Sequence, residues 1–63
     1  MYKLTQGHVD KVITNYKKGG RTIDILGAQR LARVLIGKNV EHKTGSEAAA
    51  YYSVYLWNSG YIK

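Results

Sequence analysis

The segment YKKGGRTID, residues 16–24, divides two stretches of the chain whose apolar residues recur with helical spacing. Two lysines precede Gly19 and Gly20, and an arginine and a threonine follow them. Glycine readily adopts the left-handed conformation that ends many helices, so we expect this segment to end one helix and turn the chain toward the next. Its cationic side chains and free backbone N–H groups also suit it to contact a phosphate.

An amphipathic helix is predicted before this turn. Its apolar stripe has the spacing i, i+3, i+4, i+7 and consists of Val9, Val12, Ile13 and Tyr16. Thr5 is placed to cap the N-terminus of this helix, and Gly19 is expected to be the left-handed residue at its end.

After the turn, residues 22–26 fit two structures. Thr22 is suited to cap a helix and Asp24 to occupy its first turn, where a carboxylate is favoured. Ile23 and Ile25, however, alternate with a polar residue as they would in a strand. The conformation of this segment therefore stays open.

A second helix is predicted over residues 28–37. Its stripe consists of Ala28, Leu31, Val34 and Leu35. Residues 38–45 form a connector whose conformation stays open, with a short strand near Val40 as one alternative. A third helix is predicted to begin after Ser46 as its N-cap and to run to Asn58, with Gly60 ending it.

The expected fold is therefore mainly α: a single small three-helix domain, helix-turn-helix-like, over residues 1–63. Short strands are expected at the segments YKL, TIDIL and YIK. A chain of 63 residues has a small core, and without cysteine it has no disulfide to stabilise it. No apolar run reaches the ~20 residues of a membrane span, so we expect a cytoplasmic protein.

The charge of the chain favours a polyanionic partner. Ten Lys and Arg residues against four Asp and Glu residues give a formal net charge of +6. Such a balance is typical of proteins that bind nucleic acid. The candidate nucleic-acid contacts are Lys17, Lys18, Arg21, Gln29, Arg30, Arg33 and Lys38. If the first two helices cross at the glycine turn, these side chains converge into one basic patch; otherwise they are only a solvated surface.

The third helix has two apolar faces. One arc consists of Ala48, Tyr51, Tyr52, Tyr55 and Leu56, and the other, nearly opposite, of Ala50, Val54 and Trp57. We expect the first arc to pack against the other helices. The second arc, together with Tyr61, is expected to meet a partner, most simply a second copy of the chain. Stacking of unpaired bases on these aromatic residues is the competing interpretation.

Two families share short motifs with this chain. Leu31-Ala32 and Trp57 resemble phage repressor and Cro-like domains, in which a Leu-Ala pair in one helix precedes a Trp near the end of the next. That resemblance implies a DNA-binding regulator, although residues 37–45 are longer than the turn of that family. The segment KKGGRTI, residues 17–23, resembles the Gly-x-x-Gly loop of KH domains, with Lys17 in place of the first glycine. Each likeness covers about a third of the chain.

Residues for catalysis or metal binding are sparse. The chain has no cysteine nucleophile, its four carboxylates are scattered, and its two histidines are expected to be exposed. We therefore expect neither an enzyme, a metal site nor a cofactor. The sequence indicates a dimeric DNA-binding regulator of phage or mobile-element type. The alternative is a small inhibitor or adaptor that binds an acidic surface of a larger protein through its third helix.

Overall fold

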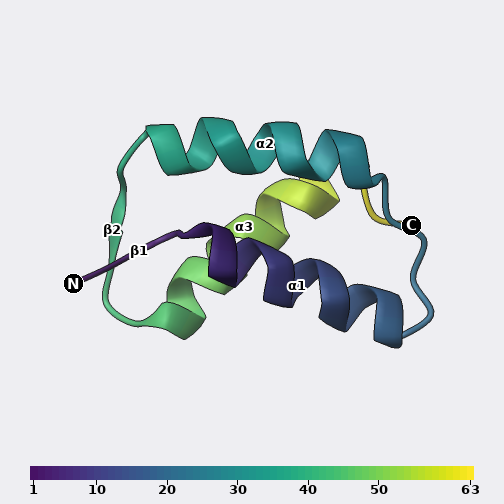
Figure 1. Cartoon of the computed structure of the whole chain (residues 1–63), viewed down its shortest axis with the longest axis horizontal. Coiled ribbons are helices and arrows are strands. Elements are labelled where there is room, and N and C mark those ends of the chain that lie inside the picture. Colours follow the sequence, from purple (N-terminus) through teal and green to yellow (C-terminus); the bar gives the residue numbers. More distant parts are fainter.

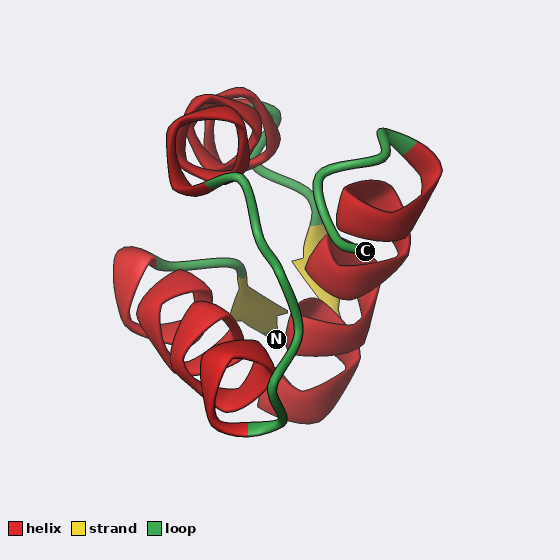
Figure 2. Ribbon diagram, turned by 90° about the vertical axis from the view of Figure 1, so that its right-hand side faces the viewer, coloured by secondary structure: helices red, strands yellow, loops and turns green.

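A computed structural model of the protein describes residues 1–63 and contains three helices and two short strands (Figure 1). The elements follow the chain as β1 (Tyr2–Lys3), α1 (Gln6–Lys18), α2 (Ile25–Gly37), β2 (Glu41–His42) and α3 (Gly45–Asn58). The prediction of a mainly α three-helix domain with short strands is confirmed. α1 and α2 run in opposite directions (Figure 1), and the view along α2 in Figure 2 places the three helices at the corners of a triangle.

The connections between the helices are loops rather than tight turns. Residues 19–24 join α1 to α2, and residues 38–44 join α2 to α3. A helix-turn-helix motif uses roughly three or four residues between its two helices. The likeness to helix-turn-helix domains is therefore one of helix order and does not extend to that turn.

Each helix begins after a residue whose side chain accepts a hydrogen bond from a backbone N–H three positions later. The capping residues are Thr5, Asp24 and Thr44, with N···O distances of 3.4, 3.1 and 3.0 Å. Thr5 is the predicted cap of α1, which is confirmed. Ser46 was expected to cap α3, but Thr44 does so, because the helix starts two residues earlier and already includes Ser46.

Residues in the left-handed conformation follow all three helices. They are Gly20, Asn39 and Gly60, with φ angles of 79°, 59° and 75°. After α1, the Arg21 N–H donates to the Tyr16 carbonyl at 3.1 Å, as in a Schellman turn. Gly19 was predicted to be left-handed, but its φ is −76°. Gly20 is the left-handed residue because this turn places it one position beyond the C-cap.

The C-terminal residues fix the start of α2. Ile23 and Ile62 form an antiparallel bridge, which joins two of the segments predicted to contain strands. Backbone hydrogen bonds of 2.8 and 2.9 Å flank this bridge. Residues 22–24 are therefore held outside the helix, and α2 begins at Ile25, three residues earlier than predicted.

The two strands close the other end of the molecule. β1 pairs with β2 in antiparallel register, with Tyr2 opposite His42 and Lys3 opposite Glu41. β1 lies in the segment YKL, as predicted, and β2 directly follows Val40. The N-terminus is thereby tied to the connection between α2 and α3.

The hydrophobic core lies between the three helices. Its buried residues are Leu4, Val9, Val12, Ile13, Ala28, Ala32, Leu35, Tyr52, Leu56 and Ile62. Tyr52 is completely buried, and its hydroxyl donates a hydrogen bond of 2.7 Å to the carbonyl of Ala28. A buried phenol needs such a partner, so this bond allows tyrosine to take the place of phenylalanine, which the chain lacks. The first apolar arc of α3 thus packs inward, as predicted.

Candidate nucleic-acid interface

A polar groove lies between the start of α1 and the exposed face of α2. Its volume is ≈ 580 Å³, and it is lined by Gln6, Leu26, Gln29, Arg30 and Arg33. α2 contains no acidic residue, and both of its arginines are exposed. Arginine and glutamine are the side-chain types that form bidentate contacts with guanine and adenine. We call this set of five residues the α2 groove.

Hydrogen bonds order one wall of the α2 groove. The Gln6 amide nitrogen donates to the Gln29 side-chain oxygen at 3.1 Å and to the Asp10 carboxylate at 2.9 Å. These bonds hold the Gln29 side chain against α1. No acidic side chain lines the groove, so the two arginines dominate its charge.

The predicted basic patch is only partly assembled. Gln29, Arg30 and Arg33 do share one face, as expected. Lys17 and Lys18 lie in the last turn of α1, and Lys38 lies at the opposite end of α2 from the glycine turn. A helix of 13 residues separates its ends by ~20 Å, so Lys38 and the glycine turn do not belong to one cluster.

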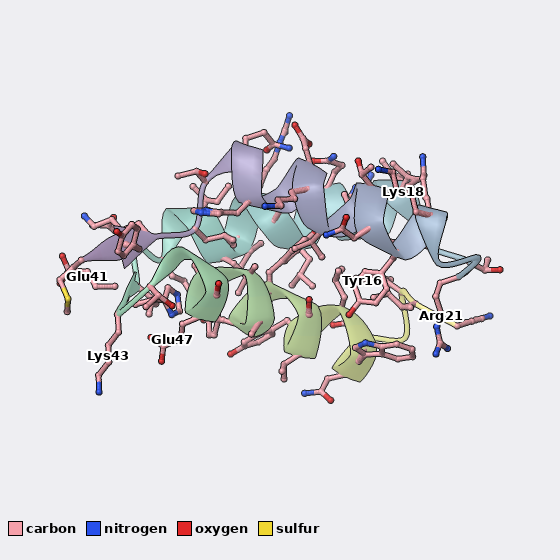
Figure 3. The ribbon with its side chains drawn as sticks, turned by 90° about the horizontal axis from the view of Figure 1, so that it is seen from below. Tyr16, Lys18, Arg21, Glu41, Lys43 and Glu47 are labelled. Atoms are coloured by element: carbon pink, nitrogen blue, oxygen red, sulfur yellow. The ribbon has the colours of Figure 1, made fainter.

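Arg21 lies away from the α2 groove. Its guanidinium carbon is 5.1 Å from the centroid of the Trp57 ring, in a cation–π contact. The Trp57 indole N–H donates to the Tyr16 hydroxyl at 3.0 Å, and the two rings meet edge to face. Arg21 therefore belongs to an aromatic cluster between α1 and α3 (Figure 3), and its predicted place beside Arg30 and Arg33 is wrong.

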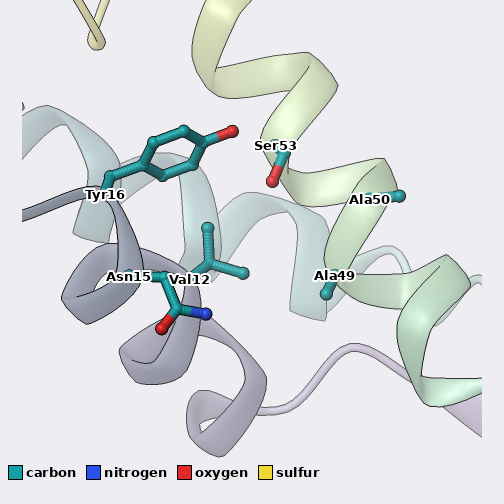
Figure 4. Close-up of a pocket in the computed structure, with 6 residues that line it drawn as sticks. All are labelled: Val12, Asn15, Tyr16, Ala49, Ala50 and Ser53. Carbon is teal, nitrogen blue, oxygen red and sulfur yellow. The ribbon is translucent and has the colours of Figure 1, made fainter. Parts of the chain in front are cut away.

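The second apolar arc of α3 faces outward, as predicted. Val54 is 55% exposed and Trp57 is 42% exposed, and Ala50 is exposed beside them. We call these three residues the α3 stripe. Next to it is a groove of ≈ 320 Å³ between α1 and α3 (Figure 4), lined by Val12, Asn15, Tyr16, Ala49, Ala50 and Ser53. The wall that α3 contributes has only small side chains.

Tyr61 does not join the α3 stripe. It follows the end of α3, and its ring lies against Gly27 of α2, where an added Cβ would be 2.6 Å from Cε1 of that ring. The prediction that Tyr61 contributes to a partner surface therefore needs correction, because its ring is already used to hold α2 and the C-terminus together.

The two histidines have structural roles instead of being exposed spectators. His8 completes the capping box of α1, with its Nδ1 3.3 Å from the backbone nitrogen of Thr5. His42 is buried, and its ring lies 4.8 Å from that of Tyr51. Its Nε2 atom has no hydrogen-bond partner. The expectation of two exposed histidines is therefore wrong.

Two residues of the α2 groove were not predicted from the sequence. Gln6 is 23 positions from Gln29, so only the packing of α1 against α2 brings them together. Leu26 falls in the segment whose conformation the sequence left open, and it is 65% exposed at the groove wall. An apolar side chain at such a place can contact a thymine methyl group.

Comparisons with known proteins add no identification. No family model matches the sequence, and no curated protein or solved structure resembles it significantly. None of the helices has both the length and the apolar composition needed to cross a membrane.

Proposed function

We propose that this protein is a cytoplasmic, dimeric DNA-binding regulator of the type found in phages and mobile elements, and that it presents the α2 groove to duplex DNA. The observation that carries the proposal is the character of α2 itself. It is a surface helix without acidic residues, and its exposed face combines two arginines with a glutamine and an apolar side chain.

Two sets of residues would make two kinds of contact with the duplex. The base contacts would come from Gln29, Arg30 and Arg33, which line one groove together with Gln6. The phosphate contacts would come from Lys17 and Lys18 in the last turn of α1 and from Lys38 at the C-terminal end of α2. Phosphate contacts position a protein on the duplex, and base contacts specify its sequence, so the two sets should respond differently to substitution.

Binding to random duplex DNA, single-stranded DNA and duplex RNA at several salt concentrations tests the proposal. We expect tightest binding to duplex DNA, with an affinity that falls steeply as salt rises. The double substitution Lys17→Ala/Lys18→Ala, which removes two proposed phosphate contacts, should reduce the slope of log affinity against log salt by about two. Arg30→Ala/Arg33→Ala, which removes proposed base contacts, should weaken binding and change that slope much less.

A matched variant separates a site from overall charge. Lys3→Ala/Lys43→Ala also removes two positive charges, but from residues near the two-stranded sheet that do not line the α2 groove. We expect it to weaken binding much less than Arg30→Ala/Arg33→Ala. Equal losses in the two variants would mean that only net charge matters, and weak binding to all three probes would reject nucleic-acid binding.

The exposed α3 stripe favours a second candidate function. A small adaptor or inhibitor would use Val54 and Trp57 to bind a larger protein and would be monomeric when isolated. A regulator would use the same side chains to dimerise. The oligomeric state of the purified chain therefore discriminates the two functions.

A further inference from the structure

The charged residues around α3 lie at its two ends. From Ala48 to Gly60 the chain has no charged residue. Figure 3 shows Glu47 at the start of α3 and Arg21 near its other end. An acidic side chain therefore flanks one end of the α3 stripe and a basic side chain flanks the other.

The α3 stripe is a surface on which another helix can approach closely. Ala50, Val54 and Trp57 repeat at intervals of four and three residues, which is the spacing of a coiled-coil seam. The adjoining groove is walled on the α3 side by Ala49, Ala50 and Ser53, so a projecting side chain can enter beside the helix.

We propose that a second copy of this chain packs its α3 antiparallel against the α3 stripe, about a twofold axis that passes between Ala50 and Val54. Ala50 of one copy then faces Val54 of the other. Three residues farther out on each side, Glu47 faces Trp57 of the second copy. Because Arg21 lies over Trp57, each Glu47 carboxylate meets the guanidinium of the second copy's Arg21.

Charge favours this orientation of a second copy. Two molecules that each carry +6 repel one another at most approaches. An antiparallel pair about this axis instead brings Glu47 of each copy to Arg21 of the other, so that opposite charges meet twice. Glu41 is opposite Lys3 in the sheet, so Glu47 is the carboxylate that meets the second copy.

The interface must extend beyond the α3 stripe. A standard interface takes ~800 Å² from each partner, which is about a fifth of the 4204 Å² surface of this chain. In a molecule whose Cα atoms span 31 × 19 × 18 Å, the contact therefore takes up most of one long face, including the groove beside the stripe. The interface completes the dimer of the regulator proposed above, but it is tested without nucleic acid, so its failure and a failure of DNA binding are separate results.

Sedimentation equilibrium of the full chain over a wide concentration range is the test. We expect a dimer in the wild type and a dissociation constant at least tenfold weaker in Val54→Lys, which places a charge at the twofold axis. Arg21→Glu should weaken the dimer about tenfold, because it breaks two symmetric pairs and opposes like charges. Glu47→Gln, which keeps the hydrogen-bond acceptor for the Lys43 N–H, should weaken it less.

Charge exchange gives the decisive comparison. Arg21→Glu combined with Glu47→Arg restores opposite charges across the interface and should return the dissociation constant to within about threefold of wild type. Lys38→Glu changes net charge as much as Arg21→Glu does, but lies at the end of α2, and should not weaken the dimer. Circular dichroism confirms that each variant is folded. A wild type that stays monomeric up to about 1 mM, a dimer insensitive to Val54→Lys, or no recovery on charge exchange would overturn the proposal.

Discussion

Two glycines of α2 should respond in opposite directions to the same substitution. Gly27 and Gly37 both lie within one turn of a helix end. A Cβ at Gly27 would lie 2.6 Å from Cε1, 2.8 Å from Cδ1 and 3.0 Å from Cζ of Tyr61, whereas a Cβ at Gly37 would have no neighbour within 4 Å. Carbon atoms normally pack at ~3.5–4.0 Å, so Gly27→Ala must move the tyrosine ring by about 1 Å.

The expected magnitudes follow from two opposing effects. Alanine in place of glycine favours a helix by roughly 0.5–1 kcal/mol, less near its ends. Overpacking costs typically ~1–3 kcal/mol. We expect Gly27→Ala to lower the free energy of unfolding by about 1–2 kcal/mol and Gly37→Ala to raise it by about 0.5 kcal/mol. Urea denaturation followed by circular dichroism measures both.

A double-mutant cycle identifies the cause. Tyr61→Ala removes the ring and is itself destabilising, because the ring covers the start of α2. In that background Gly27→Ala should become neutral or stabilising, since the clash is gone. If Gly27→Ala costs the same free energy with and without the Tyr61 ring, or costs nothing in the wild type, the close approach of these two residues is not what requires glycine there.

Three further outcomes are expected. Burial, with a smaller contribution from the charge of Asp10, raises the pKa of Tyr52 to about 12. Because the folded chain holds this phenol neutral, the stability that it confers is complete below about pH 10 and is lost as the pH rises from 10 toward 12. Tyr52→Phe, which removes the hydrogen bond to Ala28, should lower stability by about 1 kcal/mol at pH 7 and make its alkaline decline shallower; parallel pH profiles of the two proteins would contradict this. Thr44→Ala should cost about 1 kcal/mol in thermal or urea unfolding, while Ser46→Ala should cost almost nothing, and the reverse result would restore Ser46 as the cap. Leu56→Ala should cost about 2–5 kcal/mol, enough to unfold much of so small a domain, which the amplitude of its circular dichroism spectrum would reveal.

The helices and their ends could be predicted because their causes are local. The stripes of α1 and α3, the cap at Thr5 and the end of α3 at Gly60 depend on residues three or four positions apart, so spacing alone indicates them. The outward-facing apolar stripe of α3 could be predicted from the sequence for the same reason. The caps at Asp24 and Thr44 were harder to choose, because the neighbouring Thr22 and Ser46 are equally suitable by type.

Only the tertiary structure showed which residues that are distant in the sequence lie side by side. The hydrogen bond of Gln6 to Gln29 spans 23 positions, and that of Trp57 to Tyr16 spans 41. No local pattern encodes such contacts, because they depend on how the helices pack and which way the loops direct them. The sequence by itself therefore determined a small basic three-helix protein with an outward apolar stripe. Only the packed structure assigned Arg30 and Arg33 to a groove and Arg21 to an aromatic cluster, since the partners of these cations come from other helices.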